Sequence, residues 1–310
     1  MKNKLYNHLI VFINIILLIE LFINKELIIN TTHYSLNIWV TSIIPSLFPI
    51  FIISNLLINY NIINYIPKFI KNIFKYLFNI NDNELTIFLI SLIAGFPSAS
   101  VNTKIMYDKK LLNIDECNHI LMFTHFGNPI FILTTIGLIF FNNELLGIII
   151  FISHYLSNYI LGILLRNFIN KRNINNKNNN FNINFGTIFI NSITHTIDTL
   201  LTILGTLTCF LIIGNILINR LNLSNYNSCI LKGILEITMG IKELSILNIK
   251  DIYKVVLSTI FLSFGGLSIH MQVISQICYT KIKYKYFLIG RIFQSIISGI
   301  ISYIIYNIVF

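Results

Sequence analysis

Charged side chains are scarce in this chain. Only 11% of its residues are Asp, Glu, Lys or Arg, whereas soluble domains carry about 25%. Hydrophobic residues make up 55% of the sequence and the mean hydropathy is +0.75. This composition excludes a soluble globular protein. It predicts an all-α, polytopic protein of the cell membrane that crosses the bilayer many times, with about seven to eight transmembrane helices.

Cysteine is also rare, and the signatures of common catalytic sites are absent. The four cysteines have no spacing typical of a metal site, a redox pair or a disulfide framework; they are Cys117, Cys209, Cys229 and Cys278. The sequence has no metalloprotease, nucleophile-elbow or phosphate-loop motif. We therefore predict that the protein is not an enzyme and uses no cofactor and no metal.

The net charge of +10 comes from Lys and Arg in the segments between apolar runs. Residues 68–75, 104–110, 166–177 and 281–285 all fall on one side if the N-terminus is inside, as the positive-inside rule expects. We therefore expect the lipid bilayer, and not nucleic acid, as partner. Within Ile66–Phe78 the three lysines Lys68, Lys71 and Lys75 predict a basic amphipathic helix on the cytoplasmic surface.

Three polar breaks interrupt the apolar runs, although the chain has only 5 prolines. They lie at Gly95–Pro97, Gly127–Pro129 and Gly265–Gly266. Irregular backbone at membrane depth is tolerated only where protein or a watery cavity covers it, and paired breaks in two halves indicate a transporter-type site. Residues 85–106 and 230–245 are short enough either to span or to re-enter, and the sequence leaves both open.

The breaks divide the chain into two similar halves. We expect an N-terminal span at 1–35, a first repeat at 36–165, a cytoplasmic Asn-rich linker at 166–184 and a second repeat at 185–310. Ile52–Ile58 resembles Ile212–Ile218, and the two copies would run in opposite directions, as in an inverted repeat. We expect Gly95 to correspond to Gly266, and the span with His154 to the span with Arg291. The second half is expected to begin with an interfacial helix at 185–198, followed by a span at 199–218.

Nine residues at or near the breaks, or polar within an apolar segment, are candidates for binding a solute. They are Gly95, Pro97, Ser98, Asn102, Gly127, Asn128, Glu236, Gly266 and Gln272. The alternative for the breaks is a packing bend, where small residues let backbones approach. Ionisable residues inside a membrane usually find a partner, so Glu236 and Arg291 are either site residues or a structural ion pair.

Taken in order, the broken segments resemble a known family. The motifs that carry the resemblance are Ile44–Pro49, Gly95–Ser98 followed by Lys104, Gly127–Phe131 with Gly137, His154–Ser157, Leu235–Gly240, and Ser263–Ser268 with Gln272. Over about residues 36–305 the chain is similar to the sporulation integral membrane proteins of the nucleoside-recognition (Gate) domain superfamily. The resemblance implies a protein of spore-forming bacteria that is needed for a competent spore and is related to nucleoside transporters.

Three functions follow as hypotheses. The first is a transporter-like membrane protein, active in spore formation, that binds or moves a small polar solute between two Gate-like repeats. The second is a non-transporting scaffold or assembly factor of the forespore envelope. The third is an intramembrane enzyme acting through His195 and Asp198, which lie one helical turn apart; polar decoration of an interfacial helix is favoured, because no third ligand has suggestive spacing. A homo-oligomer is compatible with all three.

Overall fold

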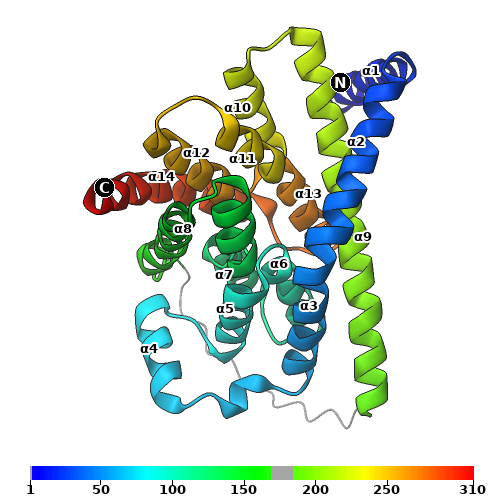
Figure 1. Cartoon of the computed structure of the whole chain (residues 1–310). Coiled ribbons are helices and arrows are strands. Elements are labelled where there is room, and N and C mark those ends of the chain that lie inside the picture. The colour runs from blue at the N-terminus through cyan, green and yellow to red at the C-terminus, as the bar shows by residue number, and fades with distance from the viewer. Residues whose placement is uncertain (1, 169–183) are drawn as a thin grey trace.

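The computed structural model describes residues 2–168 and 184–310, with side chains from residue 7 onward (Figure 1). Every regular element in these residues is a helix. Five helical segments are long and apolar enough to cross a membrane: Lys25–Asn59, Glu144–Leu164, Phe185–Leu221, Asp251–Ile277 and Tyr284–Val309. The predicted all-α, multi-pass membrane fold is confirmed. Most of the expected linker, residues 169–183, lies outside the described residues.

The first half opens with a long helical segment beside α1. Its elements are α1 (Lys2–Ile23), α2 (Lys25–Ile38), the π-helical turn η1 (Trp39–Ile43) and α3 (Ile44–Asn59). Helix α2 continues through η1 into α3, so the boundary expected after residue 35 falls inside a continuous segment. Pro45 lies in the first turn of α3, where its missing N–H is tolerated. The π-helical turn directly precedes it and accommodates the proline without ending the helix.

A hairpin follows, preceded by a surface helix. The elements are η2 (Ile62–Tyr65), α4 (Lys68–Phe78), α5 (Asp82–Ala94) and α6 (Ser98–Asp108). Helix α4 lies at 92° to α5. The Asn83 side-chain amide donates to the Leu111 carbonyl oxygen at 3.0 Å, so the chain leaves the hairpin on the side where it entered. Residues 85–106 therefore re-enter and do not span.

A broken crossing and a straight helix complete this half. They are α7 (Ile114–Phe123), η3 (Phe131–Phe140) and α8 (Glu144–Leu164). The helix stops between α7 and η3, at Thr124–Asn128, as the glycine and proline predict. His119 of α7 contacts the Leu165 carbonyl oxygen at 3.2 Å. The start of α7 and the end of α8 therefore share one side of the bundle, which we call the linker side.

The second half repeats this order. Its elements are α9 (Phe185–Leu221), α10 (Asn225–Leu235), α11 (Ile237–Ile246), α12 (Asp251–Phe264), α13 (Gly266–Ile277) and α14 (Tyr284–Val309). The two helices expected at 185–198 and 199–218 form the single helix α9, because no proline or positive-φ residue interrupts them. Helices α10 and α11 form a second hairpin, in which Cys229 lies 3.3 Å from the Gly240 carbonyl oxygen.

The long helical segments that open the two halves run in opposite directions. Trp39 donates to the Leu200 carbonyl oxygen at 2.9 Å, Ser35 lies 2.8 Å from Thr208, and Asn215 donates to Thr31 at 2.9 Å. Residue numbers fall along α9 as they rise along α2–α3, so these helices are antiparallel (Figure 1). Each half then contains a hairpin, a broken segment and a long helix, as an inverted repeat requires.

The expected correspondence of Gly95 with Gly266 is wrong. Gly95 lies at the tip of the first hairpin, whereas Gly266 lies in the break of the α12–α13 segment. By order of elements, the Gly95 tip corresponds to the Glu236 tip of the second hairpin, and the break before Pro129 corresponds to Gly265–Gly266. The two glycines share a residue type and follow apolar runs, but they occupy different elements.

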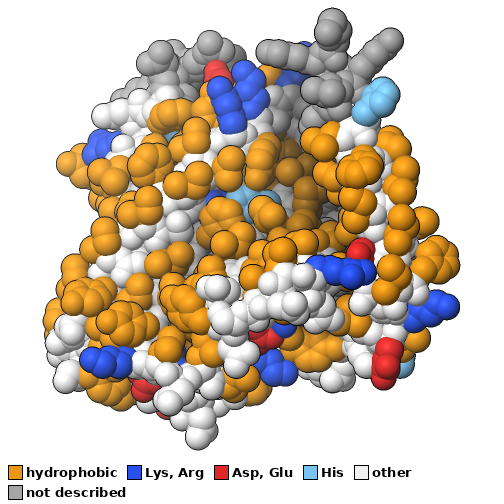
Figure 2. All heavy atoms as spheres, turned by 90° about the horizontal axis from the view of Figure 1, so that it is seen from above, with side chains coloured by type: hydrophobic (Ala, Val, Ile, Leu, Met, Phe, Trp, Pro, Cys, Tyr) orange, Lys and Arg blue, Asp and Glu red, His pale blue; other side chains and the backbone are white. Residues whose placement is uncertain are grey.

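Apolar side chains dominate the outer surface, as expected for a protein in lipid. Figure 2 shows hydrophobic side chains over most of the visible face, with Lys, Arg, Asp and Glu only at scattered points. On α1, Phe12 is 61% exposed and Phe22 is 67% exposed. In water such a surface would be unfavourable, and it supports placement of the molecule in the membrane.

Candidate solute-binding site

A central cavity lies where both hairpin tips and both broken segments meet. Its volume is about 90 Å³. The first half contributes Phe96 at the α5–α6 tip and Asn128 in the break before η3, and the second half contributes Glu236 and Gln272. The η1–α3 segment and α9 close the cavity with mostly apolar side chains and two serines, Ser42 and Ser46. A largely apolar cavity with a few polar groups is the usual form of a small-molecule site.

Glu236 is the ionisable residue among the cavity-lining side chains. It is only 3% exposed. As the N-cap of α11, its carboxylate accepts a hydrogen bond from the Met239 N–H at 2.9 Å. Among the described residues, no salt bridge involves Glu236. A carboxylate at a helix N-terminus is stabilised by the free N–H groups and by the helix dipole, which makes a buried acid tolerable here.

Asn128 and Gln272 connect the cavity wall to neighbouring elements. The Asn128 side-chain oxygen accepts from the Phe131 N–H at 3.2 Å and so caps the start of η3. The Gln272 amide donates to the Thr206 hydroxyl of α9 at 3.1 Å. Both side chains are at least 95% buried, with Asn128 4% and Gln272 5% exposed. Each has an amide group with remaining hydrogen-bonding capacity at the cavity wall.

Two glycines allow each hairpin tip to pack on a broken segment. Gly95 has φ +74°, and a β-carbon there would lie 2.5 Å from the Asn128 backbone nitrogen. Gly266 has φ +61°, and a β-carbon there would lie 3.3 Å from the Leu235 carbonyl oxygen and 3.3 Å from the Ile237 nitrogen. Both positions require the left-handed backbone that glycine adopts easily. The tip–break contact is therefore made by backbone in both halves.

The predicted site residues separate into four groups. Asn128, Glu236 and Gln272 line the central cavity, while Gly95, Pro97 and Gly266 form the turns beside it. Gly127 faces α8 instead. Its N–H donates to the His154 ring at 2.8 Å and its carbonyl accepts from Tyr155 at 3.0 Å.

The fourth group, Ser98 and Asn102, lines a different and smaller space. This second cavity, of about 10 Å³, lies between α3, α6 and α9. Its other polar lining residues are Ser54, Asn55, Thr196 and Thr199. The sequence-based set of nine therefore spans two cavities and one packing contact, and does not form a single site.

Sequence reasoning missed several residues of the central cavity. They are Ser42, Ser46, Phe96, Phe131, Thr238 and Ser268, together with apolar neighbours. Phe96 lies within the first predicted break, and Phe131 and Ser268 each follow a break by two residues. Proximity to a break was the signal that could have identified these three. Ser42 and Ser46 resemble ordinary helix residues, and only the packing of α3 against the tips reveals them.

Arg291 stabilises the broken α7 segment from behind the cavity. It is 1% exposed and donates to the carbonyl oxygens of Met122 at 3.1 Å and His125 at 3.0 Å. It also contacts Asn158 and Gln294. The last carbonyls of a helix lack partners and carry partial negative charge, so a guanidinium group suits this position. The ion pair considered between Arg291 and Glu236 does not form. Arg291 instead binds carbonyl oxygens at the end of α7, and Glu236 caps the start of α11.

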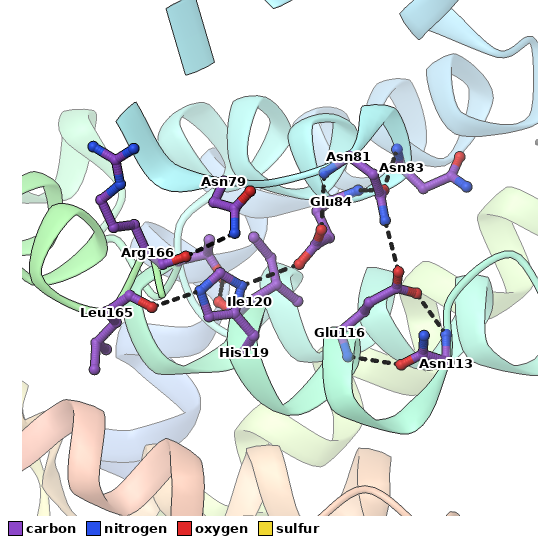
Figure 3. Close-up of polar contacts among 11 residues, drawn as sticks. Asn79, Asn81, Asn83, Glu84, Asn113, Glu116, His119, Ile120, Leu165 and Arg166 are labelled. Carbon is purple, nitrogen blue, oxygen red and sulfur yellow. Dashed lines mark hydrogen bonds and ion pairs between the residues drawn. The ribbon is translucent and has the colours of Figure 1, made fainter. Parts of the chain in front are cut away.

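A polar network on the linker side, which we call the clamp, joins α5 and α7 to the end of α8 (Figure 3). Helix α5 leads to the first hairpin tip, and α7 leads to the first break. Asn81 and Asn113 begin α5 and α7 with matching capping boxes that use Glu84 and Glu116. The Asn81 amide also donates to Glu116 at 3.0 Å. His119 contacts Glu84 at 3.2 Å and the Leu165 carbonyl oxygen, at the end of α8, at 3.2 Å. These bonds fix the register between α5, α7 and α8.

His195 and Asp198 lie outside all of these contacts. Both are on α9, where His195 is partly exposed and Asp198 is exposed. Within the described chain, no group of three or more His, Cys, Asp or Glu side chains is placed to hold a metal ion. The arrangement gives no geometric support for a catalytic role of this pair.

Comparison with known proteins identifies one curated relative, which is longer than this chain. The chain is 24% identical over 304 residues to "Sporulation integral membrane protein YlbJ" of Bacillus subtilis (strain 168), a match that covers 86% of this chain and 74% of that protein. No family model and no solved structure matches. The match confirms the resemblance that the broken motifs predict: the chain is similar over most of its length to a sporulation integral membrane protein.

Proposed function

We propose that the chain acts in spore formation as a transporter-like membrane protein that binds or moves a small polar solute in the central cavity. One observation carries the proposal: two hairpin tips and two helix breaks from opposite halves converge on one cavity with a carboxylate, two amides and several hydroxyls. Helix breaks and re-entrant hairpins leave backbone groups without helical partners at membrane depth. A protein that needed only a hydrophobic anchor would have no use for this arrangement.

The size of the cavity restricts the solute. Typical drug-sized ligands occupy pockets of about 300–1,000 Å³, and the cavity measures about 90 Å³. A molecule of a few heavy atoms, or the polar end of a larger one, suits this volume. Nucleosides are the class that the Gate resemblance suggests, and a nucleobase or ribose edge would engage the amides of Asn128 and Gln272.

The scaffold hypothesis has its own supporting observation. Helix α4 presents exposed apolar side chains, with Phe69 65% and Tyr76 71% exposed, beside the exposed Lys68 and Lys75. Such a face suits a membrane surface or a partner protein. Lys71 is less available because it pairs with Asp82 at 3.2 Å. The absence of catalytic activity and a homo-oligomeric state remain predictions.

Complementation separates the two functions. The chain is expressed in a spore-forming host that lacks its own relative, and heat-resistant spores are counted. The transporter-like function predicts that Glu236→Gln abolishes rescue while Lys68→Gln/Lys75→Gln retains it. Glu243→Gln, on the same helix but paired with Lys232 outside the cavity, is the matched control. Full rescue by Glu236→Gln together with loss in the lysine variant would overturn the proposal in favour of a scaffold.

A further inference from the structure

Three cavities follow one another along the seam between α2–α3 and α9. The first is lined by residues such as Thr31 and Asn215, and the central cavity by Ser46 and Ile203 at the same seam. The second cavity, which lies between α3, α6 and α9, follows the central cavity along the seam. In this order (first, central, second cavity), the numbers of the lining residues rise along α2–α3 and fall along α9. Thr31 to Asn55 corresponds to about 36 Å of helix, comparable to a hydrocarbon core of about 30 Å.

The second cavity contains polar groups that the protein does not satisfy. Ser98 Oγ, Asn102 Nδ2 and Thr196 Oγ1 have no hydrogen-bond partner within the described part of the chain. These residues are only 3%, 2% and 1% exposed. Buried polar groups in native proteins are nearly always paired with protein or with ordered water. Three unpaired groups from α6 and α9 at one small space therefore indicate that it holds a polar occupant.

The size and charge of the second cavity define that occupant. Its volume of about 10 Å³ matches one water molecule, which needs about 10–15 Å³ by this type of measure. No ionisable side chain lines it, and an unpaired charge would be costly there. The unpaired atoms are two hydroxyls and an amide nitrogen, which can all donate. A neutral, water-sized group with hydrogen-bond acceptors fits this set.

About one to two helical turns separate neighbouring cavities along the seam. Between the first and the central cavity, Ser35 bonds Thr208 across the seam. Between the central and the second cavity, Leu47 and Phe51 are successive turns of α3. The first barrier therefore contains one polar pair, together with Leu207 and Leu211 on successive turns of α9, and the second barrier is apolar.

We propose that the second cavity is a hydrated subsite on a polar route along this seam, which connects the central cavity toward the linker side and takes one neutral, water-sized hydrogen-bonding group. The role of this route rests on the proposed function, since the route would lead the solute to or from the central cavity. The occupancy of the second cavity by water does not depend on which solute, if any, the protein binds. The two proposals can therefore fail separately.

Stability of Thr196→Val tests the occupancy. Valine keeps the shape of threonine and replaces the hydroxyl with a methyl group. In a hydrated cavity the variant loses a hydrogen bond, and we expect a lower melting temperature in detergent. In a dry cavity it removes an unsatisfied group, so an unchanged or higher melting temperature would overturn the proposal. Thr134→Val is the control, since its hydroxyl is exposed and bonds only the Ile130 carbonyl.

Access of water is tested with a thiol in place of the same hydroxyl. Thr196→Cys is made in a background that carries Cys209→Ser and Cys278→Ser, because both native thiols are exposed. Silver ion, a water-borne probe of small radius, is added to the protein in vesicles, and each modified thiol is quantified by mass spectrometry. Cys229, which is 0% exposed and lines none of the three cavities, is the internal control. We expect the thiol at 196 to react at least ten times faster than Cys229; equal rates would overturn the route.

Discussion

Gly95 packs directly on the backbone of Asn128, so that a β-carbon on Gly95 would lie 2.5 Å from the Asn128 nitrogen. This contact joins the tip of the first hairpin to the break in the α7–η3 segment. The same relationship recurs in the second half, where Gly266 packs on the tip at Leu235–Ile237. The central cavity lies between the two contacts, and its shape therefore depends on the absence of side chains at both glycines.

Gly95→Ala is expected to destabilise the protein by about 2–5 kcal/mol, because it adds backbone strain at φ +74° to a clash with backbone atoms. Thermal unfolding in detergent measures the effect. Gly205→Ala is the matched control, since a β-carbon there meets nothing within 4 Å and alanine favours the helix by up to about 1 kcal/mol. Equal melting temperatures for the two variants would contradict the close contact.

Arg291→Lys is expected to lower stability by about 2–3 kcal/mol, because an ammonium group cannot reach the Met122 and His125 carbonyls as a fork. Arg220→Lys provides the comparison. Arg220 pairs with Glu20 at 2.8 Å, but its side chain is 53% exposed, and its replacement should change stability by less than about 0.5 kcal/mol. If both lysine variants unfolded at the parent temperature, Arg291 would not be the group that satisfies the end of α7.

Asn81→Ala is expected to cost about 2 kcal/mol, since it removes the cap of α5 and leaves one oxygen of the Glu116 carboxylate without its partner on the other helix. Asn143→Ala removes a cap from α8 without breaking a contact between helices, and should cost about 1 kcal/mol. Chemical denaturation of both variants, compared with the parent, gives the difference. A smaller cost for Asn81→Ala than for Asn143→Ala would show that the clamp does not couple α5 to α7.

The sequence alone located the breaks but not what they contact. Glycine and proline weaken a helix through their own backbone properties, whatever they pack against. Gly95, Gly127 and Gly265 therefore indicate helix breaks from the sequence alone. Asn128, Glu236 and Gln272 were identifiable because polar groups are rare in such runs. The carbonyl partners of Arg291 were not, because His125 is 166 residues away in the chain and any helix end would have offered similar groups.

The hairpins could not be distinguished from spans by composition. Helix α5 is as apolar as a crossing segment, and its return through α6 is fixed by tertiary contacts such as Asn83 with Leu111. Phe96 and Phe131 carry no polar signal and enter the cavity only because the tips converge. The correspondence between halves failed for the same reason, since Gly95 and Gly266 share a residue type but not a place in the fold.

The most direct test of a solute site is the melting temperature of the purified protein against a panel of nucleosides, nucleobases and other small spore solutes. A ligand at one hundred times its dissociation constant stabilises the folded state by about 2.7 kcal/mol, which is readily detected. We predict that at least one solute raises the melting temperature of the parent and of Glu243→Gln, and that Glu236→Gln loses the effect. No shift across the panel in a folded sample, or a shift that persists in Glu236→Gln, would contradict a solute site at the central cavity.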